Sequence, residues 1–202
     1  MKAIYTVITD NYDEIPKAPV YKGWDVILFT DIELEDNKGW EVRKLNKSDN
    51  PLLQSRDIKI RSHVHLKDYD LVCYIDGHQI FVGEPPIHPI WFMHSRRSNI
   101  FEEAKQIIKN GRFTAEEINE QIDYYKWKGY KDAGLYLNGF FVREHNEDIN
   151  KLHDVWYEET KRFTQRDQLS LPYAIWKTGI YPKNIQREEI KHRFAHVNSN
   201  HI

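Results

Sequence analysis

The stretch Leu71–Val82, LVCYIDGHQIFV, decides how this chain is interpreted. Its first five residues are apolar, and such a run with β-branched and aromatic members predicts a strand buried on both faces. The run ends in Asp76. Ligands of open α/β sheets bind just outside the carboxyl ends of the strands. We therefore expect a functional site at the end of this strand.

Asp76-Gly77-His78 permits two interpretations. In an extended segment the side chains of Asp76 and His78 point to the same side, and a carboxylate with an imidazole suits Mn²⁺ or Zn²⁺ better than Ca²⁺. Asp-Gly is also the strongest short signal for the turn of a β-hairpin, in which no ion is held. The triplet alone favours the turn, and the rest of the sequence is needed to choose between a turn and a metal site.

Composition limits the classes of function. The chain has 202 residues with 29 basic and 31 acidic side chains, so its net charge of −2 gives no strong attraction for nucleic acid or an anionic membrane. The single cysteine, Cys73, lies in the buried run and fits a reducing compartment. No run reaches the roughly 18 apolar residues of a membrane helix. We expect a soluble, cytoplasmic protein with no membrane span.

The order of apolar patterns predicts one α/β domain with a mixed sheet flanked by helices. This domain covers residues 1–182, and a C-terminal tail, 183–202, is a candidate cover for the site. We expect strands at 3–9, 24–29, 40–45, 71–75 and 90–94, and a hairpin with an Asn-Gly turn over 134–143. Helices are expected at 55–67, 99–110, 114–128 and 146–163, with a last core helix beginning near 167.

Polar side chains follow the first two predicted strands, and a cationic stripe precedes the third buried one. Arg56, Lys59 and His63 recur at spacings of three and four, so they share a face of the predicted helix. That face could meet a diphosphate, or it is simply a solvated surface. The residues themselves leave both open.

Seven short motifs carry a resemblance to a known family. They are Ile4-Tyr5-Thr6, Phe29-Thr30-Asp31, Arg56-x-x-Lys59, Tyr74-Ile75-Asp76-Gly77, His94-x-x-Arg97, Glu102-Glu103-Ala104 and Arg166-Asp167-Gln168-Leu169-Ser170. Through their order the chain resembles the glycosyltransferase-like domain family of plant mucilage-related and bacterial proteins, over most of its length. More distantly it is similar to the family 8 retaining glycosyltransferases, which have a GT-A fold.

The resemblance implies a GT-A-like fold, a nucleoside-diphosphate sugar as donor (a UDP-sugar by default), a glycan acceptor, and Mn²⁺ or Mg²⁺. Asp76-Gly77-His78 would replace the Asp-x-Asp metal motif, with His78 in the place of the second Asp. His196 or His192 would supply a third ligand. Asp167-Gln168 resembles the pair beside the donor sugar, which somewhat favours retention of configuration.

Glycosyl transfer then assigns roles to the remaining candidates. Arg56 and Lys59 would neutralise the diphosphate. Asp167 would stabilise an oxocarbenium-like centre while Gln168 binds sugar hydroxyls. Four residues near the early strand ends would hold the base and ribose: Thr6, Thr9, Tyr12 and Asp31. Contacts to acceptor or phosphate would come from His94, Arg97 and Arg166. Gly77 lets the backbone approach the ligand.

Two other functions remain open from the sequence. A metal-dependent hydrolase would use Asp76, His78 and a further histidine around an activated water. A non-catalytic binding module or transferase-like scaffold is supported by the replacement at His78. Locally, Arg166 with Asp167 is also interpretable as a surface ion pair of little energetic weight, and His94 as part of a basic loop. The transferase hypothesis requires Asp76 and Asp167 to converge on one site.

Overall fold

The protein is built on a seven-stranded mixed sheet. The structure, a computed structural model, describes residues 1–93, 96–111, 113–186 and 194–196. Strand order is β3-β2-β1-β4-β7-β6-β8, in which β7 runs antiparallel to both of its neighbours and the other pairs are parallel. The bounds are β1 Lys2–Ile8, β2 Asp25–Thr30, β3 Glu41–Lys44, β4 Leu71–Ile75, β6 Ile90–Met93, β7 Tyr136–Glu144 and β8 Asn184–Gln186.

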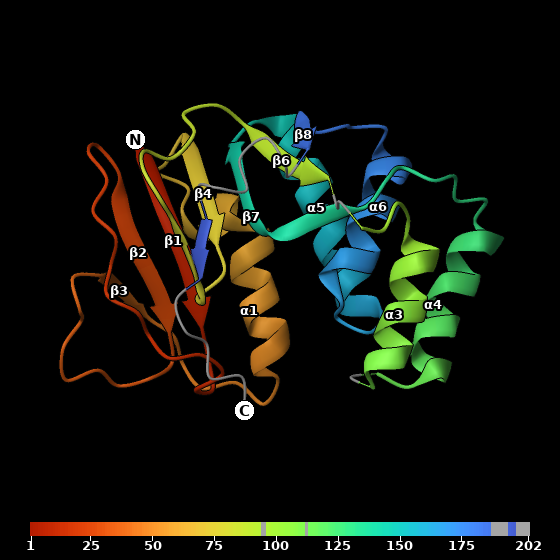
Figure 1. Ribbon diagram of the computed structural model, residues 1–202, viewed down its shortest axis with the longest axis horizontal. Coiled ribbons are helices and arrows are strands. Elements are labelled where there is room, and N and C mark those ends of the chain that lie inside the picture. Colours follow the sequence, from red (N-terminus) through yellow and green to blue (C-terminus); the bar gives the residue numbers. More distant parts are fainter. Residues whose placement is uncertain (94–95, 112, 187–193, 197–202) are drawn as a thin grey trace.

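Six helices are described along the sheet. They are α1 Pro51–Ile60, α2 Ser62–His65, α3 Ile100–Asn110, α4 Ala115–Trp127, α5 Glu147–Arg162 and α6 Asp167–Thr178. Figure 1 shows β1 to β3 at one end of the molecule and the α3–α4 pair at the other, with α5 and α6 between them. The α/β class with a mixed sheet is thus confirmed. Within the described ranges every helix is too short or too polar to cross a lipid bilayer.

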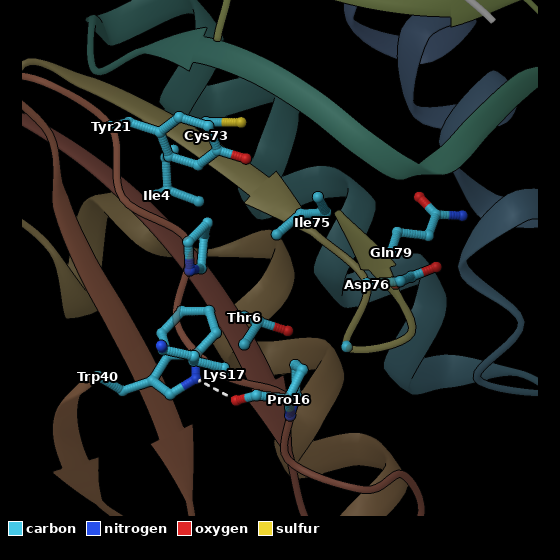
Figure 2. A pocket seen from close by; sticks show the side chains of 12 residues that line it. Ile4, Thr6, Pro16, Lys17, Tyr21, Trp40, Cys73, Ile75, Asp76 and Gln79 are labelled. Carbon is cyan, nitrogen blue, oxygen red and sulfur yellow. Dashed lines mark hydrogen bonds between the residues drawn. The ribbon is translucent and has the colours of Figure 1, made fainter. Parts of the chain in front are cut away.

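Alternation along the strands divides the core between the two faces of the sheet. Tyr5, Tyr74 and Phe141 pack on the helical side against Trp156 of α5. On the opposite side an irregular, proline-containing segment replaces helices, and Trp40 donates a hydrogen bond of 2.8 Å from its indole nitrogen to the carbonyl oxygen of Pro16 (Figure 2). Helices therefore cover one face of the sheet, and an irregular segment covers the other.

The helix expected at 55–67 differs in its bounds. It begins at Pro51, because Asn50 caps it by accepting a hydrogen bond of 2.9 Å from the backbone N–H of Leu53, and proline suits the first helical position. It ends at Ile60 and is followed by the short α2. The predicted stripe is therefore divided, and His63 pairs with Asp154 instead of joining Arg56 and Lys59.

The predicted hairpin over 134–143 is wrong. The chain runs through Asn138-Gly139 as the single strand β7, because backbone pairing with β4 on one side and β6 on the other outweighs the local turn signal.

Asp76-Gly77 does form a turn, but the turn does not belong to a hairpin. The N–H of Gln79 bonds to the carbonyl oxygen of Asp76 at 2.9 Å. However, the following strand, β5 (Gln79–Phe81), pairs with β9 (Phe194–His196) and not with β4.

Two strands, β8 and β9, fall within the predicted tail. The strand β8 extends the main sheet beside β6, and β9 reaches the segment that follows Asp76. Residues 184–186 thus belong to the main sheet, whereas residues 194–196 form a separate two-stranded sheet with β5. The domain boundary at 182 and the covering role of the tail stay predictions.

A buried histidine cluster surrounds Arg143, away from the Asp76 end of β4. Arg143 Nε donates to Ser62 Oγ at 2.9 Å, and the same hydroxyl lies 2.9 Å from His145 Nε2. Burial and the nearby Arg143 charge lower the pKa of His145 to about 4. Burial, with Arg143, also holds the pKa of His153 well below its usual value. These histidines are neutral in the folded protein.

This cluster predicts sensitivity to acid. A histidine whose folded-state pKa lies below its unfolded value of about 6.5 stabilises fully above that value, and the contribution is lost as pH falls toward the folded-state pKa. We expect the free energy of unfolding to fall between pH 7 and pH 4, and to fall less in His145→Gln. Urea unfolding across this range measures both slopes; equal slopes in the two proteins would rule out His145 as a contributor.

Candidate active site

Asp76 and Asp167 converge on one lysine. Lys59 Nζ lies 2.8 Å from Asp167 Oδ2 and 3.5 Å from Asp76 Oδ1. The side chains of Lys59 and Asp167 are 4% and 5% exposed, whereas that of Asp76 is 29% exposed. The two acids that the sequence analysis required to meet therefore share a single ammonium group, and Asp76 is the member of the trio most open to solvent.

Three different elements hold this trio. Lys59 lies in the last turn of α1, Asp76 directly follows β4, and Asp167 is the first residue of α6. The hydroxyl of Tyr74 donates to Asp76 Oδ1 at 2.8 Å, and Trp156 Nε1 donates to the backbone oxygen of Asp167 at 2.8 Å. An anionic side chain at the N-terminus of a helix is also favoured by the helix dipole. The core of the domain thus fixes each group.

Cations keep Asp167 ionised. Arg56 Nε lies 3.8 Å from Asp167 Oδ1 and donates to the carbonyl oxygen of Gln165 at 3.3 Å. Gln165 has φ +59°, a left-handed conformation that costs free energy in a non-glycine residue. Burial by itself would raise the pKa of Asp167, but Arg56, Lys59 and Arg166 outweigh it and hold that pKa well below its usual value. Asp167 is a buried anion and not a surface ion-pair partner.

Arg97 and Arg166 meet at a residue to which the sequence analysis gave no role. Both guanidinium groups pair with Glu103 of α3. Arg166 also donates to Gln168 Oε1 at 3.2 Å, which connects it to the Asp167-Gln168 pair. An acid that is buried by arginines from distant segments produces no recognisable pattern in the local sequence. The motif Glu102-Glu103-Ala104 was the one sequence signal that included Glu103.

Two further residues of β7 were missed because they were assigned to a turn. A Cβ on Gly139 would lie 2.8 Å from Asp76 Oδ2, and the backbone N–H of Asp76 donates to the Gly139 oxygen at 2.8 Å. Asn138 is 6% exposed, and within the described residues neither of its side-chain polar atoms has a hydrogen-bond partner. Glycine inside a strand signals a close approach. Here the group that approaches is the Asp76 carboxylate.

Gly139→Ala is therefore expected to displace the Asp76 carboxylate. Overpacking of this kind costs about 1–3 kcal/mol of stability. The UDP binding that the sequence analysis assigns to Asp76 should weaken too, and each 1.4 kcal/mol needed to return the carboxylate to its place would cost about tenfold in affinity. Titration calorimetry with UDP measures the loss. Gly111→Ala is the control, because Gly111 ends α3 with φ +70° and nothing within 4 Å, and should affect stability alone. Equal UDP affinity in both variants would contradict the close-approach argument.

The residues predicted to hold base and ribose lie near the ends of β1 and β2. Thr9 Oγ1 donates to the Pro51 oxygen at 3.2 Å, and Asp31 Oδ1 accepts from the backbone N–H of Asp10 at 2.9 Å. Tyr12 is 65% exposed. Thr6 is buried and lines a cavity of about 10 Å³ together with Asp76 and Gly77 (Figure 2). A cavity of this size holds about one water molecule, so it is no base pocket by itself.

The predicted metal ligands are only partly described. Within the described ranges no group of three metal-ligating side chains gathers. His78 Nε2 lies 3.5 Å from Gln79 Nε2. His196 pairs opposite Gln79 through its backbone in β9, which brings it to the same turn. The side chain of His196 lies outside the described part of the chain, as do His94 and His192.

Gly77 is closely packed against β1. A Cβ on Gly77 would lie 2.8 Å from Ile8 Cδ1, so close packing already requires this glycine.

Comparisons with known proteins agree with the resemblance derived from the motifs. Residues 90–196 match the TOD1/MUCI70 glycosyltransferase-like domain. Over an alignment of 86 residues the chain is 31% identical to "Probable hexosyltransferase MUCI70" of Arabidopsis thaliana. That match covers 38% of this chain and 15% of the plant protein, so the chain spans a small part of this relative. The chain belongs to the TOD1/MUCI70 glycosyltransferase-like family.

Proposed function

We propose that this protein transfers a sugar from a nucleoside-diphosphate sugar, with a UDP-hexose as the first candidate, to a glycan acceptor. The observation that carries the proposal is the convergence of Asp76 and Asp167 on Lys59. Family membership supports the class of reaction. The printed name of the plant relative, a probable hexosyltransferase, supports a hexose as the sugar.

The charges of the site suit a diphosphate leaving group. Arg56 and Lys59 are held in place before any ligand arrives, and preorganised cations stabilise charge that develops in a transition state. Asp76, as the exposed member of the trio, marks the side from which a ligand enters. A diphosphate bound there would compete with the carboxylates for the Lys59 protons, so binding and reorganisation of the trio are coupled.

A divalent metal fits the donor chemistry of the turn. A carboxylate with imidazoles suits Mn²⁺, with Mg²⁺ as the alternative. We propose that Asp76 and His78 hold the ion and that His196, whose backbone lies opposite Gln79, is the third ligand. A bound metal would supply Lewis-acid stabilisation of the leaving diphosphate. Removal of metal with EDTA should then abolish turnover, and Mn²⁺ should restore it.

The buried pair Asp167-Gln168 is proposed to face the donor sugar. An ionised carboxylate near the anomeric carbon stabilises an oxocarbenium-like transition state, and the low pKa of Asp167 keeps it ionised. Gln168 would bind sugar hydroxyls, together with the Asn138 amide, which has no hydrogen-bond partner among the described residues. The Asp-Gln pair favours retention of configuration, which NMR of the newly formed anomeric centre would test.

The deciding experiment measures UDP release from a panel of UDP-hexoses, with Mn²⁺ and with EDTA. Thermal denaturation with UDP, GDP and metal accompanies it, because a ligand at a hundred times its Kd stabilises by about 2.7 kcal/mol. Metal-dependent release supports the transferase. Stabilisation by metal alone would favour the hydrolase, and no response to any ligand would favour the scaffold.

A further inference from the structure

Glu103 is a buried acid at the edge of the site. It lies in the first turn of α3, and its side chain is 1% exposed. Burying a carboxylate is costly unless it is paired. Its two oxygens each take one guanidinium group: Oε1 lies 3.1 Å from Arg166 Nη2, and Oε2 accepts from Arg97 Nε. One acid thus holds two arginines that come from different segments.

A continuous line of hydrogen bonds leads from this acid into the site. Arg166 Nη2 donates to Gln168 Oε1 at 3.2 Å, and Gln168 Nε2 donates to the Tyr136 oxygen at 2.9 Å. The line joins α3, α6 and β7. It uses both ends of the Gln168 amide, so the amide cannot flip without turning its NH₂ group toward a cation.

The position of Arg166 at the start of α6 does not by itself orient its guanidinium group. Arg166 is the N-cap residue of α6, yet its side chain makes no capping hydrogen bond. Its Nε is buried and has no hydrogen-bond partner within the described residues. Gln165, just before it, has φ +59°. Glu103 is the carboxylate that pairs with this guanidinium, and Gln168 Oε1 accepts a hydrogen bond from the same nitrogen.

Stability alone explains the arrangement poorly. The apolar side chains of Ile100, Ala104 and Ile107 already dock α3 against Leu169 and Tyr173 of α6. Buried ion triads are weak evidence for stability, because apolar residues of similar volume often replace them without loss. A charged triad at this place is better explained by the orientation that it imposes.

We propose that Glu103 is a positioning residue of the transferase site. By holding Arg166 it orients the Gln168 amide toward the donor sugar and keeps a cation beside Asp167. The inference rests on the proposed function and deepens it. Glu103 touches neither substrate nor reacting atoms; it acts through Arg166.

The test compares Glu103→Gln with Glu159→Gln in the full chain. Glu159 on α5 is a matched control, because its side chain is 4% exposed and pairs with Lys177 at 2.9 Å, outside the site. Two measurements are made on each variant: kcat and KM for UDP release from the UDP-hexose that the wild type uses best, and the side-chain amide signal of Gln168 in a ¹H–¹⁵N spectrum. That signal is assigned by its loss in Gln168→Met.

In Glu103→Gln we expect the Gln168 amide signal to move and kcat to fall by about 10–100-fold, because a small misplacement of a positioning group can cost about 100-fold in rate, with little change in KM. Glu159→Gln should change neither. An unmoved amide signal, or a kcat loss no larger than that of Glu159→Gln, would overturn the role of Glu103. A wild type that releases UDP from no donor refutes the proposed function itself, which is a different result.

Discussion

Asp167→Asn should lower turnover by about 100-fold to 1,000-fold, as expected when one preorganised electrostatic group is removed from a transition state. The substitution keeps the shape of the side chain and removes its charge. UDP binding should not weaken, because Asp167 is proposed to face the sugar and, as a carboxylate, competes with the diphosphate for Lys59. Single-turnover kinetics and UDP titration separate these two effects.

Asp154→Asn is the control for this experiment. Asp154 is an exposed carboxylate that pairs with His63, away from the trio. Its loss should leave turnover unaffected. If Asp167→Asn retains full turnover in a preparation whose wild type is active, Asp167 is structural and the role proposed for it is wrong.

Lys59→Met should have the largest effect on stability. The substitution leaves two carboxylates without the ammonium group between them, and breaking a buried pair by removing one partner costs about 3–5 kcal/mol. At pH 7 the free energy of unfolding should fall by this full amount. The loss should shrink at low pH as Asp167 takes up a proton, because Lys59 is one of the cations that hold the pKa of Asp167 below its usual value and the variant lacks it.

Urea unfolding at several pH values measures this prediction. The control is Lys126→Met, since Lys126 pairs with Asp123 at an exposed position and such pairs contribute about 0–1 kcal/mol. If Lys59→Met loses no more free energy of unfolding than Lys126→Met, the two carboxylates are stabilised by water or by other cations in the variant. The trio would then not be the organising element of the site.

Local patterns were sufficient to place the two acids at the ends of their elements. Asp76 ends a run of apolar residues, and the structure buries all of Leu71–Ile75. Asp167 begins a helix whose apolar residues follow it directly. The spacing of Arg56 and Lys59 correctly placed both on one face of α1. Each inference depended on residues close together in the chain.

Contacts between distant parts of the chain explain why the hairpin prediction was wrong and why Glu103 was missed. Asn138-Gly139 carries the strongest turn signal, yet β4 and β6 pair with the chain on both sides of it and keep it extended. Glu103 follows an acid in a capped helix and resembles any other residue of a first turn. Its burial depends on Arg97 and Arg166, which only the folded chain brings to it.

Whether Asp76 forms part of a donor site is tested by calorimetric titration of UDP, with and without Mn²⁺, into the wild type and into Asp76→Ala. We expect saturable, metal-dependent binding in the wild type and its loss in Asp76→Ala, while the far-UV circular dichroism of the variant is unchanged. Equal binding in the two proteins, or no binding by the wild type, would contradict this expectation.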